Sequence, residues 1–159
     1  MSGELSHLDE HGRARMVDVA GKAVTARTAT ATAVVRMTPA TATALAAGRL
    51  PKGDALAVAR VAGIMAAKKT PELIPLCHPI SLTSVTVDID VDTTAGTADI
   101  AVTTSTTERT GVEMEALVAA GVTAFTLYDM IKGVERGATV EHVRVDAKAG
   151  GANGDWERP

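Results

Sequence analysis

Four ionisable side chains flank the most apolar stretch of the chain, residues 109–133 (RTGVEMEALVAAGVTAFTLYDMIKG). Glu113 and Glu115 stand near its start, and Asp129 and Lys132 near its end. Asp129 and Lys132 are three positions apart, so on a helix they share a face and can form an ion pair. On a buried face such a pair could transfer protons near neutral pH, because burial and coupling can move both pKa values inward. The same spacing equally fits a structural ion pair, in which the lysine also complements the helix dipole.

The helix expected over residues 112–135 is apolar on both sides. On a helical wheel, Asp129 and Lys132 share one stripe with the largest apolar side chains: Met114, Leu117, Val118, Val122, Phe125 and Tyr128. The opposite side carries mostly smaller side chains: Ala116, Ala119, Ala120 and Thr123, then Leu127 and Met130. A helix that is apolar all round is covered on both sides. We therefore expect the pair to lie on a buried face, the sheet to form one cover, and another helix or a second subunit to pack on the small-residue side.

The two ends of this helix are too far apart to share one small ligand. Glu113 and Asp129 are 16 positions apart, which an unbroken helix converts to roughly 24 Å along its axis. Either the helix breaks near Gly121, or each site combines opposite ends of two helices. A two-fold dimer with antiparallel helices would provide the second arrangement.

Three further cations are candidates for phosphate binding. Lys52 lies in the turn at 51–54 before a helix, where it could hold phosphate together with backbone N–H groups. Most lysines in such turns are simply solvated. Lys148 could add a second phosphate contact, unless the C-terminus is frayed, and Arg109 could pair with phosphate or with the nearby glutamates. Glu113 and Glu115 are either ordinary first-turn acids or acceptors for the N–H edge of a guanine-like base.

The segment Cys77-His78-Pro79 lies in an apolar context. Adjacent residues rarely ligate one ion together, so we expect no metal site there, and only adventitious metal binding at residues 7–11 (HLDEH). His78 is either a core histidine with its hydrogen bonds satisfied or an acid/base group at the edge of a pocket.

Periodicity and caps predict the elements that position these residues. Thr38-Pro39 and Thr70-Pro71 combine a hydroxyl N-cap with a first-turn proline, and residues 84–92 alternate as a half-buried antiparallel strand does. The expected order is a strand at 24–37, a helix at 39–47, a second helix from the turn at 51–54 to about Lys69, a short turn, strands at 84–92 and 98–102, the helix at 112–135 and a strand at 139–147. This order predicts an α+β ferredoxin-like sandwich, an antiparallel sheet with helices packed on one face.

Composition limits the class of protein. The 159 residues suit one domain, with residues 1–15 as a mobile arm. A net charge of −3 argues against a broad nucleic-acid or membrane surface. The single cysteine, Cys77, excludes an internal disulfide and a multi-cysteine zinc site. With no apolar signal segment and no long uninterrupted apolar span, a cytoplasmic location is expected, and no cofactor is expected.

Several long motifs in fixed order resemble the molybdenum cofactor biosynthesis protein C family. They are KGDALAVARVAGIMAAKKT at 52–70, LIPLCHP at 73–79, TGVEMEAL at 110–117 and YDMIK at 128–132, together with MVDV at 16–19 and AKAGG at 147–151. The likeness spans nearly the whole chain. Phe125 replaces a smaller aliphatic residue and Glu108 a common glycine, and neither departure touches a catalytic position.

The resemblance implies an activity that the wheel and the spacing do not reveal. Members of this family are lyases that convert 3′,8-cyclo-7,8-dihydro-GTP, made by a partner radical SAM enzyme, to cyclic pyranopterin monophosphate and diphosphate. It also implies hexamers built as trimers of dimers, with the active site at the dimer interface. A non-enzymatic nucleotide or pterin binder and an oligomeric scaffold are the alternatives. The presence of every catalytic-position residue argues against a degenerate binder.

The resemblance also assigns roles to residues of this sequence. Asp129, Lys132 and Lys52 match the catalytic positions. The substrate-binding positions are matched by Leu76, Cys77, His78, Glu113, Met114, Glu115 and Lys148, and we add Arg109 as a phosphate contact. We expect Lys132 and Asp129 to act as acid and base, and Lys52 to share proton transfer or hold phosphate.

Overall fold

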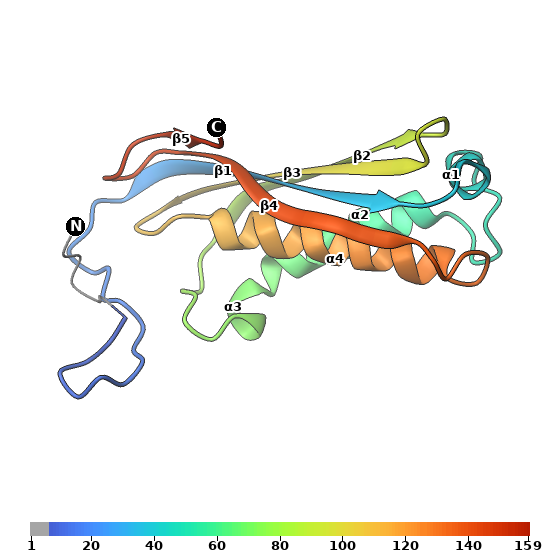
Figure 1. The fold of residues 1–159 in the computed structure, drawn as a ribbon. Coiled ribbons are helices and arrows are strands. Elements are labelled where there is room, and N and C mark those ends of the chain that lie inside the picture. Colours follow the sequence, from blue (N-terminus) through green and yellow to red (C-terminus); the bar gives the residue numbers. More distant parts are fainter. Residues whose placement is uncertain (1–6) are drawn as a thin grey trace.

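An antiparallel sheet with helices on one face makes up the fold (Figure 1). The structure is a computed structural model and describes residues 7–159. Its elements are β1 (Thr25–Arg36), α1 (Pro39–Ala46), α2 (Ala55–Lys68), α3 (Thr70–Leu73), β2 (Leu82–Asp92), β3 (Thr97–Glu108), α4 (Glu113–Ile131), β4 (Thr139–Ala149) and β5 (Trp156–Glu157). The strand order is β2-β3-β1-β4-β5, with β1 at the centre. The predicted α+β class is confirmed.

The central strand presents small side chains to the helices. Ala29, Ala31, Ala33 and Val35 alternate along β1 and are buried, each at most 1 % exposed. Their partners on β3 include Val102 and Ile100, also buried. Because alanine projects little from a sheet, helix backbones can come close to it, and dispersion contacts are gained along the whole strand.

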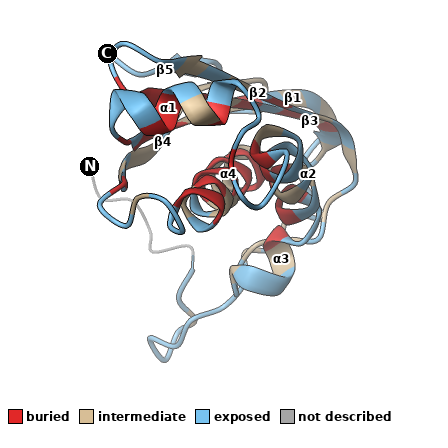
Figure 2. Ribbon diagram, turned by 90° about the vertical axis from the view of Figure 1, so that its right-hand side faces the viewer, coloured by how far each residue is buried: buried red, intermediate tan, exposed pale blue. Residues whose placement is uncertain are grey.

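Helices α2 and α4 lie side by side on this face, as Figure 2 shows when the molecule is turned toward one end of the sheet. They meet at Gly63 of α2, where an added Cβ would lie 2.2 Å from the Thr123 Oγ1 of α4. The side of α4 that faces the sheet and α2 is the small-residue side, in which Ala116, Ala119 and Ala120 are fully buried. The small-residue side was expected to pack against another helix or a second subunit. The structure shows another helix of the same chain, α2, on that side.

The opposite stripe of α4 corrects an expectation. The side chains of Asp129 and Lys132 are 52 % and 51 % exposed, and Phe125 is 59 % exposed, so this stripe does not face the core. The sheet selects the small-residue side because only that side allows the close approach that alanine-rich β1 requires. Within the described chain the ion pair is thus a surface pair.

The differences from the expected elements are local. Strand β3 continues to Glu108, past the end expected at residue 102. Thr70 is the first residue of α3 and its hydroxyl donates to the Ala66 carbonyl, so it does not cap that helix as expected. Helix α4 ends at Ile131 rather than near residue 135, and the short strand β5 pairs with the end of β4, where no strand was expected. Residues 7–15 contain a turn closed by a bridge between Leu8 and Ala14, whereas the mobility of the arm stays a prediction and residues 1–6 lie outside the described residues. Among residues 7–159 only α4 is long and apolar enough to cross a membrane, and it is mostly buried, as core helices of soluble proteins are.

Candidate active site

Two lysines converge on one aspartate at the C-terminal end of α4. The Lys52 Nζ lies 2.6 Å from the Asp129 Oδ2, and the Lys132 Nζ lies 2.7 Å from the Asp129 Oδ1. Lys52 also donates a hydrogen bond to the Asp129 backbone carbonyl at 2.8 Å. We call Lys52, Asp129 and Lys132 the catalytic trio, after the role that the sequence predicts for them. The structure brings together all three residues predicted to be catalytic.

A tight turn carries Lys52 to this position. Gly53 has a φ of 91°, a conformation that glycine adopts without strain. The Asp54 carboxylate then caps α2 by accepting a hydrogen bond from the Ala57 N–H at 3.0 Å. Lys52 in turn satisfies a carbonyl of the last turn of α4, which has no partner within that helix. Lys52 therefore has hydrogen-bond partners within the protein and is not merely solvated.

The pKa of Asp129 is lowered and the pKa of Lys132 is raised, so the two values move apart. This corrects the expectation that burial would bring them closer together. Hydrogen bonds from Lys132 and then Lys52 lower the pKa of Asp129 to about 2. The Asp129 carboxylate, in return, raises the pKa of Lys132 above its usual range. Because the pair is half-exposed, attraction between opposite charges outweighs desolvation. Asp129 is therefore ionised and Lys132 protonated throughout the neutral range.

The other predicted substrate-binding residues gather at the N-terminal end of α4. The loop after α3 packs against the first turn of α4 and lines a cavity of about 420 Å³. We call this cavity the LCH pocket, and its lining includes Leu76, Cys77, His78, Glu113, Met114 and Glu115.

One carboxyl group of the LCH pocket is buried. Glu115 is 3 % exposed, and burial raises the pKa of its carboxyl, with the Glu113 charge adding to the effect. Burial also raises the pKa of the Cys77 thiol, with the Glu115 charge as the second cause. Cys77 is therefore a neutral thiol at pH 7, and Glu115 forms no ion pair among residues 7–159.

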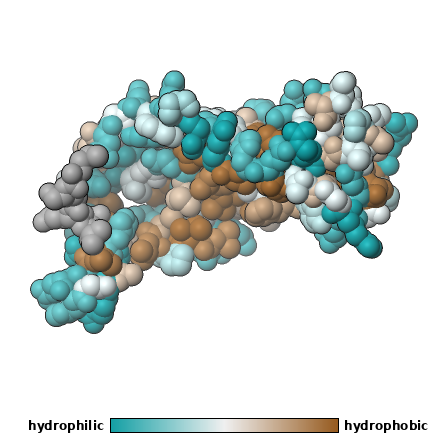
Figure 3. All heavy atoms as spheres, in the orientation of Figure 1, coloured by the Kyte–Doolittle hydropathy of each residue, from teal (hydrophilic) through white to brown (hydrophobic). Residues whose placement is uncertain are grey.

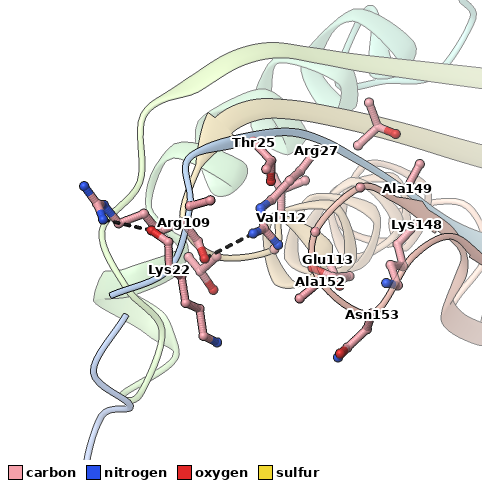
Figure 4. A pocket seen from close by; sticks show the side chains of 16 residues that line it. Lys22, Thr25, Arg27, Arg109, Val112, Glu113, Lys148, Ala149, Ala152 and Asn153 are labelled. Carbon is pink, nitrogen blue, oxygen red and sulfur yellow. Dashed lines mark hydrogen bonds between the residues drawn. The ribbon is translucent and has the colours of Figure 1, made fainter. Parts of the chain in front are cut away.

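A second cavity adjoins the first and is rich in cationic side chains (Figure 4). We call this cavity of about 490 Å³ the basic pocket; its cations are Lys22, Arg27, Arg109 and Lys148. The two pockets share Lys22, Thr110, Gly111 and Glu113. Lys148 lies on β4 opposite Ala29 and donates a hydrogen bond to the Gly154 carbonyl. Its place in a strand rules out the frayed terminus.

Arg109 and His78 hold backbone atoms. The Arg109 Nη1 donates to the Ala20 carbonyl at 2.5 Å and to the Lys22 carbonyl at 2.9 Å. The His78 Nε2 lies 2.7 Å from the Val17 carbonyl. The expected pairing of Arg109 with a nearby glutamate is absent among the described residues, because its guanidinium bonds the N-terminal segment instead.

The two groups of candidate residues occupy opposite ends of α4. The helix runs without a break from Glu113 to Ile131, past Gly121, so the alternative of a broken helix is wrong. The catalytic trio and the LCH pocket are consequently separated by roughly 24 Å within one chain, the length of 16 helical residues. A single chain therefore does not assemble them around one small ligand.

Sequence reasoning missed two cations of the basic pocket, Lys22 and Arg27. Arg27 shares the helix-facing side of β1 with Ala29, Ala31 and Ala33. In a strand, alternate residues point to the same face, so a single charged residue in register with the buried alanines could have been noticed in the sequence. Lys22 follows the MVDV motif in a segment without periodicity, so its sequence neighbours gave no comparable signal.

Comparison with known proteins gives consistent results. The profile of the MoaC family matches residues 16–151. The cyclic pyranopterin monophosphate synthase of Nocardioides sp. is 56% identical over 98% of this chain and 96% of its own length. The proteins of the same name from Herpetosiphon aurantiacus and Parvibaculum lavamentivorans are 57% and 54% identical, over 98% and 97% of this chain and 94% and 96% of their own lengths.

Proposed function

The chain belongs to the MoaC family, and we infer that it is a cyclic pyranopterin monophosphate synthase, a lyase of molybdenum cofactor biosynthesis. Its substrate would be 3′,8-cyclo-7,8-dihydro-GTP, and its products cyclic pyranopterin monophosphate and diphosphate. The observation that carries this proposal is the catalytic trio, in which two ammonium groups contact one carboxylate at 2.6 and 2.7 Å.

The catalytic trio supplies an acid with a coupled base. Because the Asp129 carboxylate raises the pKa of Lys132 in the free site, this lysine becomes an effective acid only when bound substrate weakens the pair. Lys132 then donates the proton needed when the purine-derived imidazole ring opens. Once Lys132 is neutral, its attraction no longer holds the Asp129 pKa down, so the carboxylate becomes a better base for the next proton. Lys52 keeps the carboxylate in place and shares proton transfer or contacts phosphate.

The final step needs positive charge around a triphosphate. A sugar hydroxyl attacks the α-phosphorus, the new P–O bond forms, and the bond to the β-phosphate oxygen breaks. The hydroxyl proton passes to a base, and diphosphate leaves with the bonding electrons. Lys148 of the basic pocket would stabilise charge that develops on the leaving oxygens. Glu113 and Glu115 of the LCH pocket would accept hydrogen bonds from the base.

A second copy of the chain is needed to bring both ends of α4 to one substrate. We propose a dimer with antiparallel α4 helices, repeated three times in a hexamer, with the site between the two chains. In its support, α2 and α4 expose large apolar side chains, including Val58, Val61, Met65 and Phe125. Figure 3 shows apolar atoms gathered over the middle of the molecule, where Figure 1 places these helices. Such a patch marks an interaction surface.

The biosynthetic role adds two proposals. The substrate has to be supplied by a radical SAM enzyme acting before this one, and both reactions would take place in the cytoplasm. Neither a nucleic acid nor a membrane is a proposed partner.

The decisive assay presents cyclised GTP to the purified protein and measures diphosphate and the pterin product in a single turnover. Wild-type protein is expected to form both in equal amounts. Asp129→Ala is expected to be folded and oligomeric but inactive. A folded, oligomeric and fully active Asp129→Ala protein would refute the assignment of the catalytic trio.

A further inference from the structure

Residues 17–22 form a segment without regular secondary structure that lies against the start of α4; we call it the strap. One internal hydrogen bond shapes it, from the Lys22 N–H to the Val19 carbonyl at 3.0 Å. The Asp18 carboxylate adds another by accepting from the Ala20 N–H at 2.8 Å. The strap is thus a defined turn that carries Lys22 at its end.

Two side chains from outside the strap anchor it. His78 contacts the Val17 carbonyl at one end, and Arg109 donates to the Ala20 and Lys22 carbonyls at the other. Both bonds of Arg109 start from the same nitrogen, Nη1, so this one atom bridges two carbonyls of the same turn. In Figure 4 the Arg109 guanidinium extends away from Lys148 and Asn153 and toward the Lys22 backbone.

Lys22 occupies the border between the two pockets. It lines both the LCH pocket and the basic pocket, and it is the only cation that does so among residues 7–159. No hydrogen bond or ion pair engages its ammonium within this described part of the chain, and Figure 4 shows the side chain leaving the strap on the side away from the Arg109 guanidinium. Because the Lys22 backbone is anchored, its ammonium is placed at the border of the two pockets, where it could bind an anion that extends into both.

Resting on the proposed function, we propose that Lys22 binds the phosphate chain of the substrate and that Arg109 is a positioning residue, which acts on the substrate only through the strap. The base would occupy the LCH pocket, the phosphate chain would enter the basic pocket, and Lys22 would contact the phosphates where the pockets join. This assignment replaces the expected direct contact between Arg109 and phosphate. A guanidinium with one nitrogen between two carbonyls is oriented by the backbone and not by a ligand.

Inorganic triphosphate is the probe for a binding test by titration calorimetry. Lys22→Gln is expected to weaken its binding about tenfold, the usual scale for one charge-assisted contact. Arg109→Gln is expected to weaken it by a similar factor, and the double variant no further, because both changes remove the same contact. Arg109→Lys is expected to bind nearly as wild type does, since one nitrogen suffices to bridge the two carbonyls.

Additive losses in the double variant would overturn the proposal, because they would show that Arg109 contacts the ligand itself. Wild-type affinity in either Lys22→Gln or Arg109→Gln would also overturn it. Arg144→Gln is the matched control; Arg144 pairs with Asp146 and lines neither pocket, so triphosphate affinity is expected to be unchanged.

Hydrogen exchange of the wild-type protein provides a measurement that needs no variant. Triphosphate is expected to slow exchange of the strap amides, and no change there would overturn the proposal even if Arg109→Gln fails to fold. The assay on cyclised GTP distinguishes the two levels of inference. A wild-type protein that binds triphosphate through Lys22 but releases no diphosphate would defeat the proposed function and leave the strap assignment standing.

Discussion

Mixing two inactive variants should restore activity if each site takes one end of α4 from each of two chains. The two isosteric changes are Asp129→Asn in the catalytic trio and Glu115→Gln in the LCH pocket. Asp129→Asn removes the carboxylate that contacts both lysines. Glu115→Gln points an amide donor at the N–H edge of the base, so a buried donor is left without an acceptor. Each variant alone should fall to about a hundredth of wild-type activity or less.

The size of the recovery follows from the geometry. The two altered positions lie at opposite ends of an unbroken helix, separated by roughly 21 Å for 14 residues, so one chain cannot bring both to the same substrate. When the two variants assemble at random, about half of the dimers contain one of each, and two-fold symmetry gives such a dimer one doubly altered site and one fully wild-type site. About a quarter of all sites, and so about a quarter of wild-type activity, should therefore be restored.

The assay compares single-turnover diphosphate release by each variant alone and by oligomers from equal co-expression. Copies of different mass allow native mass spectrometry to verify that mixed oligomers have formed. Mixed oligomers that are no more active than the parents would refute the shared site. A wild-type activity that survives dilution to a proven monomer would refute it independently.

Three further predictions concern packing and titration. Gly63→Ala should destabilise the fold by about 2 kcal/mol and lower Tm by about 5 °C, because the new methyl group would collide with Thr123 where two helices cross. Lys132→Met should raise the pKa of Asp129 from about 2 toward about 3.9, which carboxylate-carbon NMR titration measures. Glu115→Gln should raise Tm at about pH 7, because burial raises the pKa of this carboxyl and its charged form therefore disfavours folding. The gain in Tm should vanish below about pH 4, where the glutamate is protonated in both the folded and the unfolded protein.

Each of these predictions has a control and an opposing outcome. Gly133→Ala adds the same methyl group where no atom lies within 4 Å, and equal losses at the two glycines would contradict the close crossing. Lys52→Met should raise the Asp129 pKa less than Lys132→Met does, since the Lys132 hydrogen bond is the larger cause of the lowered pKa; the reverse order would contradict the proposed ranking. A Tm difference for Glu115→Gln that is constant with pH would show that the effect is not one of charge.

The sequence determined the elements and most of the local chemistry. Alternation fixes which side chains of β1 share a face, and helical spacing places Asp129 beside Lys132, because both follow from backbone periods. The Thr38-Pro39 cap predicted the start of α1, and the motifs around Leu76 to Pro79 and Glu113 to Glu115 supplied the LCH pocket. The family was also identifiable from those motifs. Local rules and resemblance were sufficient for all of these features.

The tertiary structure decided what the local rules left open. Periodicity showed two apolar sides of α4 but not which one would be buried. Close packing on the alanines of β1 and on Gly63 selected the small-residue side, which leaves the catalytic trio at the surface. There the pKa of Asp129 is lowered and the pKa of Lys132 is raised. Lys52 meets Asp129 across 77 positions, and Arg109 reaches the strap across 87. Such contacts depend on how turns aim whole elements at one another, and no window of sequence contains that information.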